Sequence, residues 1–189
     1  EWSIKQVPGN RFVVCSGGGP GIMEASNRGA KKAGGKSIGL NISLPFEQNP
    51  NPYITPALNF EFHYFFMRKF WFAYLAKALI IMPGGYGTMD ELFELLTLIQ
   101  TKKIRKKMPI VVYDKHFWEK VINFEELANK RLIDKEDLKL FLIAETVDEA
   151  FHYVKNDLQK HYMQKPDSLF NQKAKVTPKE KKKLAKKES

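Results

Sequence analysis

The chain has 189 residues, 43% of them hydrophobic, which is enough for one domain of ordinary size with a substantial core. Every apolar run is shorter than the roughly 18–20 residues of a membrane-spanning helix, and the N-terminus shows no basic-then-apolar signal pattern, so we expect no membrane partner. A lone cysteine, Cys15, excludes an internal disulfide framework and fits a reducing, cytoplasmic setting.

The net charge of +10 lies mainly near the C-terminus. Residues 173–189 hold eight Lys and two Glu and carry +6, which leaves +4 for the rest of the chain. We therefore predict a single domain at residues 1–163 and a basic, disordered tail at residues 164–189. Two interpretations of the tail stay open: a solvated end, or non-specific contact with nucleic acid. Only the tail supports a function as a nucleic-acid binder.

In the body of the chain, short apolar β-rich runs alternate with longer helical patterns. In chain order we predict strand 11–15, helix 22–33, strand 36–42, strand 60–62, helix 64–77, strand 78–82, helix 89–100, strand 109–113, helix 117–130, strand 140–143 and a final helix after residue 146. Gly34 and Gly35 end the first helix. Thr146, with Glu149 three residues later, forms a capping-box signature for the last helix.

Apolar strands separated by helices predict a parallel sheet covered on both faces. The predicted fold class is α/β, a Rossmann-like, doubly wound parallel sheet in three α/β/α layers. Residues 1–10 look like the end of a helix and a linker. The first strand of the fold is therefore expected to be absent from this chain.

A first glycine loop, residues 17–21, follows the first predicted strand and opens a helix. Ligands bind at this end of the strands in open α/β sheets, and free N–H groups at a helix start attract anions. A tight strand–helix turn is the structural alternative. The spacing is not G-x-G-x-x-G and no acidic residue ends the next strand, so a dinucleotide fingerprint is not met.

A second glycine loop, residues 83–88 (PGGYGT), lies in the same setting before the helix predicted at 89–100. Three glycines and a Thr hydroxyl at a helix start can cradle one phosphate group. The loop lacks the Gly-Lys-Ser/Thr ending that holds the phosphates of a triphosphate, so a monophosphate fits better.

Asp90 and Glu91 are predicted in the first turn of that helix. Carboxylates there can simply complement the helix dipole. Two carboxylates beside a phosphate loop also repel the anion, which favours a chemical role for one of them.

Three separated motifs together resemble the LOG family, the cytokinin riboside 5′-monophosphate phosphoribohydrolases, long labelled possible lysine decarboxylases. They are residues 16–30 (SGGGPGIMEASNRGA), Met67-Arg68-Lys69 and residues 83–91 (PGGYGTMDE). The resemblance spans about residues 9–155, and residues 41–52 and 97–103 are similar to the longer bacterial branch.

The resemblance implies hydrolysis of the N-glycosidic bond of an adenine or N6-modified adenine nucleoside 5′-monophosphate, giving free base and ribose 5-phosphate. It implies that Arg68 and Glu91 are catalytic. The residues expected to bind the 5′-phosphate are Gly84, Gly85, Gly87 and Thr88. The residues expected to bind the rest of the substrate are Gly18, Gly19, Met23, Glu47, Lys69, Tyr86, Asp90 and Thr97. The family's pocket forms at a subunit interface, so a homodimer or higher oligomer is expected.

Breaking a ribosyl C–N bond builds positive charge on the sugar, which calls for a fixed carboxylate and a positioned water. Glu91 can supply the carboxylate and act as general base, while Arg68 can orient it or neutralise the phosphate or the departing base. We expect the arginine to keep Glu91 ionised. The reaction needs no metal and no cofactor.

Other functions stay open. A non-catalytic nucleotide-binding or carrier module of the same fold would bind nucleotide without releasing base. A lysine decarboxylase would need a lysine that carries pyridoxal phosphate, and none stands out. Four histidines show no ligand spacing and are expected to be structural or exposed: His63, His116, His152 and His161.

Overall fold

A computed structural model describes residues 1–5, 12–45 and 49–163. Its strands are β1 (Val14–Ser16), β2 (Ser37–Ile42), β3 (Asn59–Phe62), β4 (Leu79–Ile81), β5 (Ile110–Tyr113) and β6 (Leu142–Ala144). Its helices are α1 (Ile22–Lys32), α2 (Phe65–Leu75), α3 (Tyr86–Gln100), α4 (Lys115–Val121), α5 (Phe124–Asn129) and α6 (Val147–Leu158). Short helical turns are η1 (Trp2–Lys5), η2 (Pro56–Leu58), η3 (Lys135–Leu140) and η4 (Gln159–Met163). The predicted tail and Glu47 lie outside the described residues.

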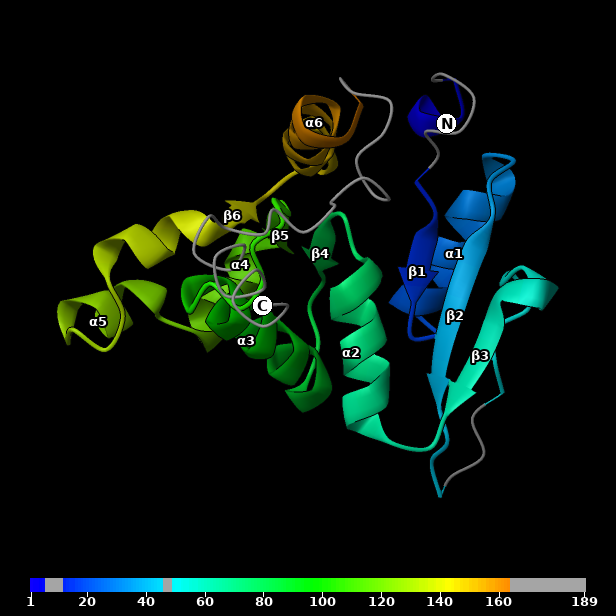
Figure 1. The fold of residues 1–189 in the computed structure, drawn as a ribbon, viewed down its shortest axis with the longest axis horizontal. Helices are drawn as coiled ribbons and strands as arrows, with labels where there is room; N and C mark the ends of the chain where they lie inside the picture. The colour runs from blue at the N-terminus through cyan, green and yellow to red at the C-terminus, as the bar shows by residue number, and fades with distance from the viewer. Residues whose placement is uncertain (6–11, 46–48, 164–189) are drawn as a thin grey trace, which may run out of the picture.

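The strands form two parallel sheets of three, in the orders β1-β2-β3 and β4-β5-β6, flanked by helices (Figure 1). This confirms the α/β, parallel, Rossmann-like class. β1 and β4 are the edge strands on the sides where the two sheets face each other. Among the described residues, neither strand has a further strand partner on that side. Val14 and Ile80, on these edges, stay partly exposed.

The main hydrophobic core lies under the β4–β6 sheet and fixes α3. Its buried members are Ile81, Leu92, Ile110, Val112, Trp118 and Phe124. Leu92 and Leu95 of α3 are both buried, and burying each leucine contributes about 1.5–3 kcal/mol. Their packing leaves Asp90, Glu94 and Thr97 on the accessible side of the same helix.

The helix predicted at 89–100 begins three residues earlier than expected, at Tyr86, with Gly85 as its N-cap. Gly87 and Thr88 are therefore helical, and Asp90 and Glu91 lie in the second turn, so their predicted first-turn position is wrong. The buried leucines fix the whole helix, and this packing overrides the low helix propensity of Gly87. Beyond the first turn the helix dipole acts weakly on the two carboxylates.

The helix predicted at 117–130 is two helices, α4 and α5, so a single helix here is wrong. The break lies at Asn123, whose side chain accepts a hydrogen bond from the Glu126 N–H at 2.9 Å. Such an N-cap starts a new helix and lets Trp118 and Phe124 enter the core from different helices.

The cap predicted for the last helix is confirmed, because Thr146 Oγ1 accepts from the Glu149 N–H at 3.2 Å. The Glu149 carboxylate accepts from the Glu145 N–H at 3.0 Å, whereas a full capping box would require the N–H of Thr146.

Within the described ranges, every helix is too short or too polar to cross a membrane.

Candidate active site

The first glycine loop lies at the carboxyl end of β1, and the close approach of Asn41 restricts its conformation. Gly18 has φ +78°, and a methyl group there would collide with the Asn41 side chain. A larger residue at position 18 would therefore be strained, and both Gly18 and Gly19 are buried.

A buried polar network holds this loop, and sequence reasoning missed it. Asn51 Nδ2 donates to Gly18 O at 3.0 Å, to Gly19 O at 3.1 Å and to Asn27 Oδ1 at 3.0 Å. Ser16 Oγ donates to the same Asn27 oxygen at 2.7 Å. Asn51 lies in the Pro/Asn-rich segment after β2. No pattern in the sequence indicates that it contacts Asn27. The network ties the first glycine loop to that segment.

Arg68 of α2 and Glu91 of α3 form an ion pair, with 3.1 Å between Nη2 and Oε1. The Arg68 side chain is 12% exposed and that of Glu91 28%, so water screens this pair only in part. The guanidinium lies 5.4 Å from the Phe65 ring centroid and 5.8 Å from that of Phe72. Its buried Nε has no hydrogen-bond partner among the described residues.

The first glycine loop reaches the same pair. A methyl group placed on Gly17 would lie 2.8 Å from Met23 Sδ and 3.9 Å from Arg68 Nη1. The structure thus brings Gly17, Met23 and Arg68 together, beside Glu91.

The net shift of the Glu91 pKa is opposite to the one expected from its arginine partner. Burial raises the pKa of this carboxyl above its usual range, and the opposing effect of Arg68 is smaller. Asp90 adds to the rise because its like charge disfavours ionisation. Arg68 lowers the pKa of Glu91, as expected for an ion pair, but desolvation of the carboxylate outweighs that effect, so the net shift is upward.

The second glycine loop forms the N-terminal end of α3. A methyl group on Gly84 would clash with the Thr88 side chain, whereas one on Gly85 or Gly87 would meet open space. The first N–H groups of an α-helix have no partner within the helix, so those at this end remain available to a ligand. Tyr86, at the start of the helix, is 94% exposed and covers none of this end.

Lys69 of α2 bridges two carboxylates of α3, beside the Arg68–Glu91 pair. Its Nζ lies 3.1 Å from Asp90 Oδ2 and 2.9 Å from Glu94 Oε2. These contacts, led by Glu94, raise the pKa of the Lys69 ammonium. Sequence reasoning missed Glu94, although its spacing of four residues from Asp90 puts both on one helix face.

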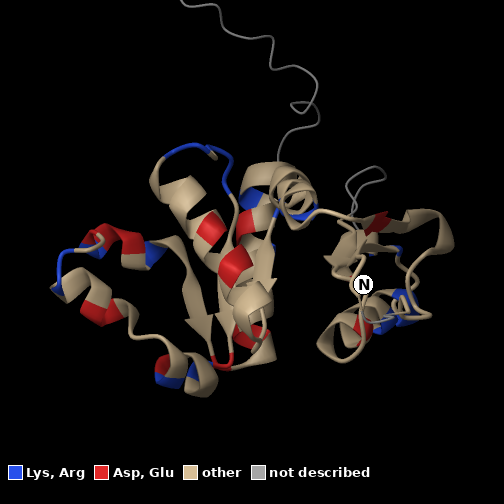
Figure 2. Ribbon diagram, turned by 90° about the horizontal axis from the view of Figure 1, so that it is seen from below, with Lys and Arg blue, Asp and Glu red and all other residues tan. Residues whose placement is uncertain are grey.

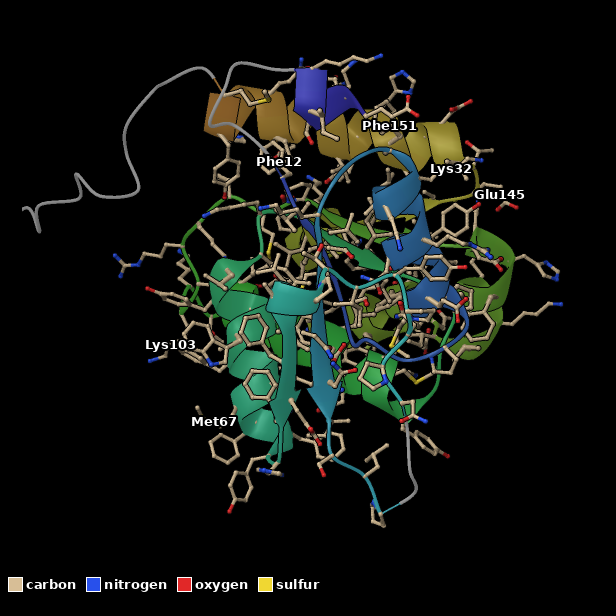
Figure 3. All side chains as sticks on the ribbon, turned by 90° about the vertical axis from the view of Figure 1, so that its right-hand side faces the viewer. Phe12, Lys32, Met67, Lys103, Glu145 and Phe151 are labelled. Atoms are coloured by element: carbon tan, nitrogen blue, oxygen red, sulfur yellow. The ribbon has the colours of Figure 1, made fainter. Side chains whose placement is uncertain are left out.

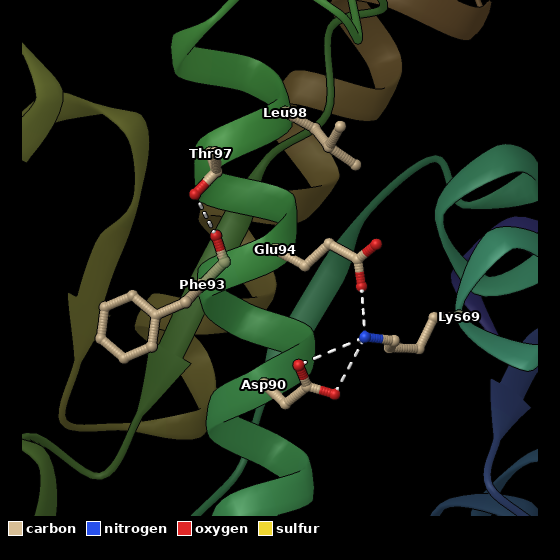
Figure 4. Close-up of a pocket in the computed structure, with 6 residues that line it drawn as sticks. All are labelled: Lys69, Asp90, Phe93, Glu94, Thr97 and Leu98. Carbon is tan, nitrogen blue, oxygen red and sulfur yellow. Dashed lines mark hydrogen bonds and ion pairs between the residues drawn. The ribbon is translucent and has the colours of Figure 1, made fainter. Parts of the chain in front are cut away.

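A shallow pocket of about 360 Å³ lies along this face of α3 (Figure 4). It is lined by Lys69, Asp90, Phe93, Glu94, Thr97 and Leu98. Three of the predicted substrate-binding residues, Lys69, Asp90 and Thr97, thus share one pocket. The ammonium of Lys69 reaches across from α2 to α3 (Figure 4).

Met67 of α2 lies at the periphery of the molecule (Figure 3). None of the residues of this helix is buried, and Tyr64, Phe66, Phe70 and Tyr74 are all more than half exposed. At the end of the helix, Lys106 Nζ donates to Ala73 O at 2.6 Å.

Lys106 belongs to the basic loop of residues 102–107, between α3 and β5 (Figure 2). Burial, with a smaller effect of Lys77, lowers the pKa of Lys106 to about 8.

Across the described ranges, no three His, Cys, Asp or Glu side chains are grouped so that they could hold a metal ion.

These features define an α/β protein in which two glycine-rich loops, each opening a helix, lie beside a partly buried Arg–Glu pair. The chain belongs to the family described as "Possible lysine decarboxylase", whose model matches residues 23–154. The predicted family resemblance is confirmed.

Curated relatives are similar at low identity. The "Cytokinin riboside 5′-monophosphate phosphoribohydrolase LOG" of Oryza sativa subsp. japonica is 28% identical over 134 residues, 70% of this chain and 54% of the relative. The "Probable cytokinin riboside 5′-monophosphate phosphoribohydrolase LOG4" of the same organism is 26% identical over 139 residues, 72% of this chain and 59% of the relative. The chain thus spans little more than half the length of these relatives.

Proposed function

We propose that the protein hydrolyses the N-glycosidic bond of an adenine or N6-modified adenine nucleoside 5′-monophosphate to free base and ribose 5-phosphate. The observation that carries the proposal is the partly buried Arg68–Glu91 pair, one helical turn from the second glycine loop. The names of the curated relatives describe the same reaction class.

In this proposal the 5′-phosphate binds at the N-terminal end of α3. Gly85 and Gly87 leave space there, Thr88 adds a hydroxyl, and the helix dipole favours an anion. Glu91 lies four residues after Gly87, about 6 Å along the axis at 1.5 Å per residue. A ribose held by its phosphate would then meet Glu91 near its anomeric carbon.

Glu91 acts as general base in the reaction. The water oxygen bonds to C1′ as the bond from C1′ to the base nitrogen breaks, and the base leaves with the electron pair. The water proton passes to the Glu91 carboxylate and is available to the departing base. A raised pKa makes Glu91 a better proton acceptor when ionised, and its charge opposes the positive charge on the sugar. Arg68 steers this carboxylate through the ion pair.

The chemistry of Lys69 argues against decarboxylation, the activity in the family's description. A lysine that forms a Schiff base must lose its proton, which burial away from anions favours. Lys69, the lysine in the pocket, has two carboxylate partners that raise its pKa and keep it charged. Such an ammonium is a poor nucleophile.

We further propose that a second copy of the chain covers the aromatic face of α2, which is formed by the exposed side chains of Tyr64, Phe66, Phe70 and Tyr74. Phe70 and Tyr74 stack there with ring centroids 5.4 Å apart and are exposed in one copy. Large exposed apolar patches mark interaction sites, and aromatic residues are enriched in them. Because Arg68 and Lys69 lie on the same helix, the interface would border the catalytic pair.

The direct test is incubation of the protein with AMP, followed by chromatography for adenine and an assay for ribose 5-phosphate. Release of both products in equal amounts is expected. In Glu91→Gln, turnover falls by at least about 100-fold while AMP still binds, because only the acid–base group is lost. The matched control is Glu119→Gln, an exposed α4 residue paired with Lys115, and it should retain wild-type turnover.

AMP binding without base release would instead favour a non-catalytic nucleotide-binding module. Near-normal turnover in Glu91→Gln would remove Glu91 from its role even if the reaction is observed.

A further inference from the structure

Beyond Glu91, the accessible face of α3 continues into the pocket that contains Lys69, Glu94 and Thr97. Helical geometry places Glu94 seven residues after Gly87, about 10 Å along the axis. Phosphate, sugar and base follow one another along a nucleotide in that order. With phosphate at the helix start and sugar at Glu91, the base would reach the pocket beside Glu94.

The hydrogen-bond donors of this pocket already have partners, and one acceptor has none among the residues that the structure describes. The Lys69 ammonium is engaged by Asp90 Oδ1 at 3.2 Å, by Asp90 Oδ2 at 3.1 Å and by Glu94 Oε2 at 2.9 Å. The Thr97 hydroxyl donates its hydrogen to Phe93 O at 2.7 Å. For the other Glu94 oxygen, Oε1, no partner exists within the described part of the chain. The donors are thus engaged within the protein, while Glu94 Oε1 remains as an acceptor for a ligand.

The net charge of the pocket also favours a ligand group that donates a hydrogen bond. Lys69 contributes one positive charge against the two negative charges of Asp90 and Glu94, so the group carries an excess of one negative charge. A base edge with an N–H donor is favoured beside such a group, and a carbonyl oxygen is repelled. The 6-position of a purine offers this contrast, since adenine has an amino group where hypoxanthine has an oxygen.

We propose that this pocket receives the purine base and that Glu94 selects 6-amino over 6-oxo purines by accepting a hydrogen bond from the exocyclic amino group. One N–H survives substitution at N6, so both plain and N6-modified adenine satisfy the same acceptor. Phe93 and Leu98 supply the apolar part of the pocket for the ring or its substituent. The inference rests on the proposed function, because the phosphate loop and Glu91 set the position of the base.

The test compares AMP with inosine 5′-monophosphate, which differs at the 6-position. Dissociation constants are measured by calorimetry in Glu91→Gln, where turnover is suppressed, and kcat/KM is measured in the otherwise wild-type protein. We expect tighter binding and faster hydrolysis of AMP. Adding Glu94→Gln should reduce the AMP preference about tenfold or more, because a hydrogen bond to a charged acceptor is lost and the amide can donate to a 6-oxo group.

Two further variants separate recognition from structure. Glu119→Gln is the matched exposed control and should keep the AMP preference. Lys69→Met removes the bridge but leaves the Glu94 charge, so it should retain or increase the preference even where overall activity falls. Equal losses for both nucleotides in Glu94→Gln, or equal affinities in the parent protein, would overturn the inference.

The two proposals can fail separately. Preferential AMP binding that Glu94→Gln abolishes, without any base release, would keep the base pocket and reject hydrolysis. Base release without discrimination between the two nucleotides would keep hydrolysis and reject the role of Glu94.

Discussion

At the scale of single residues, the environment of Glu91 decides its chemistry. Desolvation raises the pKa of its carboxyl, while Arg68 at 3.1 Å partly offsets that rise. In the proposed mechanism Glu91 is a general base and must be ionised, so activity is expected above this pKa and should be lost as the pH falls through it. The acid limb of the pH profile should therefore lie above the usual range of a glutamate.

Arg68→Met should move this acid limb to higher pH, because it removes the charge that lowers the pKa of Glu91. The limb is measured from kcat/KM against pH, and the Glu91 titration can be followed independently by carbon NMR without substrate. Arg28→Met on α1, where the guanidinium lies 5.9 Å from the Tyr53 ring, is the control and should leave the limb unchanged. An unshifted or lowered titration in Arg68→Met would contradict the assigned coupling.

At the scale of elements, the first glycine loop depends on one amide in the segment after β2. The Asn51 side chain is buried and satisfies the carbonyls of Gly18 and Gly19 together with Asn27. Asn51→Ala removes three buried hydrogen bonds and takes from Gly19 O its side-chain donor, which costs about 1–3 kcal/mol. Gly18 O keeps the backbone N–H of residue 51 at 2.8 Å, and Asn27 Oδ1 keeps the Ser16 hydroxyl at 2.7 Å. In a domain of this size, each kcal/mol lowers Tm by about 2–4 °C.

Thermal unfolding measures this loss, and an increased KM for AMP should accompany it because the loop beside Met23 and Arg68 loosens. Asn156→Ala, an exposed position on α6, should change stability by less than about 0.5 kcal/mol. Equal stability of the two variants would show that the Asn51 network does not hold the loop.

At the scale of the whole molecule, the exposed face of α2 predicts association. Phe70→Glu places a charge in the centre of the aromatic face and should shift the protein toward monomer in sedimentation experiments, since a buried unpaired charge is costly. Leu132→Glu, at a 70% exposed residue away from α2, should leave the association state unchanged. A monomeric parent protein would reject the proposed interface.

Much of the fold could be predicted because its patterns are local. The six predicted strands and the first helix agree with the observed strands and α1 to within a few residues, since short apolar runs and glycine at helix ends leave clear signals. The single helix predicted at 117–130 failed because its apolar pattern continues across Asn123, and only the observed cap shows the break.

The sequence by itself determined the residue types of the site and their order: two glycine loops, the Arg68-Lys69 pair and the Asp90-Glu91 pair. Each of these is a short motif, and the order of residues within it is enough to recognise it. Only the tertiary structure decided that Arg68 bonds to Glu91 while Lys69 joins Asp90 to Glu94, and that burial outweighs the arginine in setting the pKa of Glu91. The reason is physical: desolvation and ion pairing depend on how α2 packs beside α3, and that packing is set by contacts far apart in the chain.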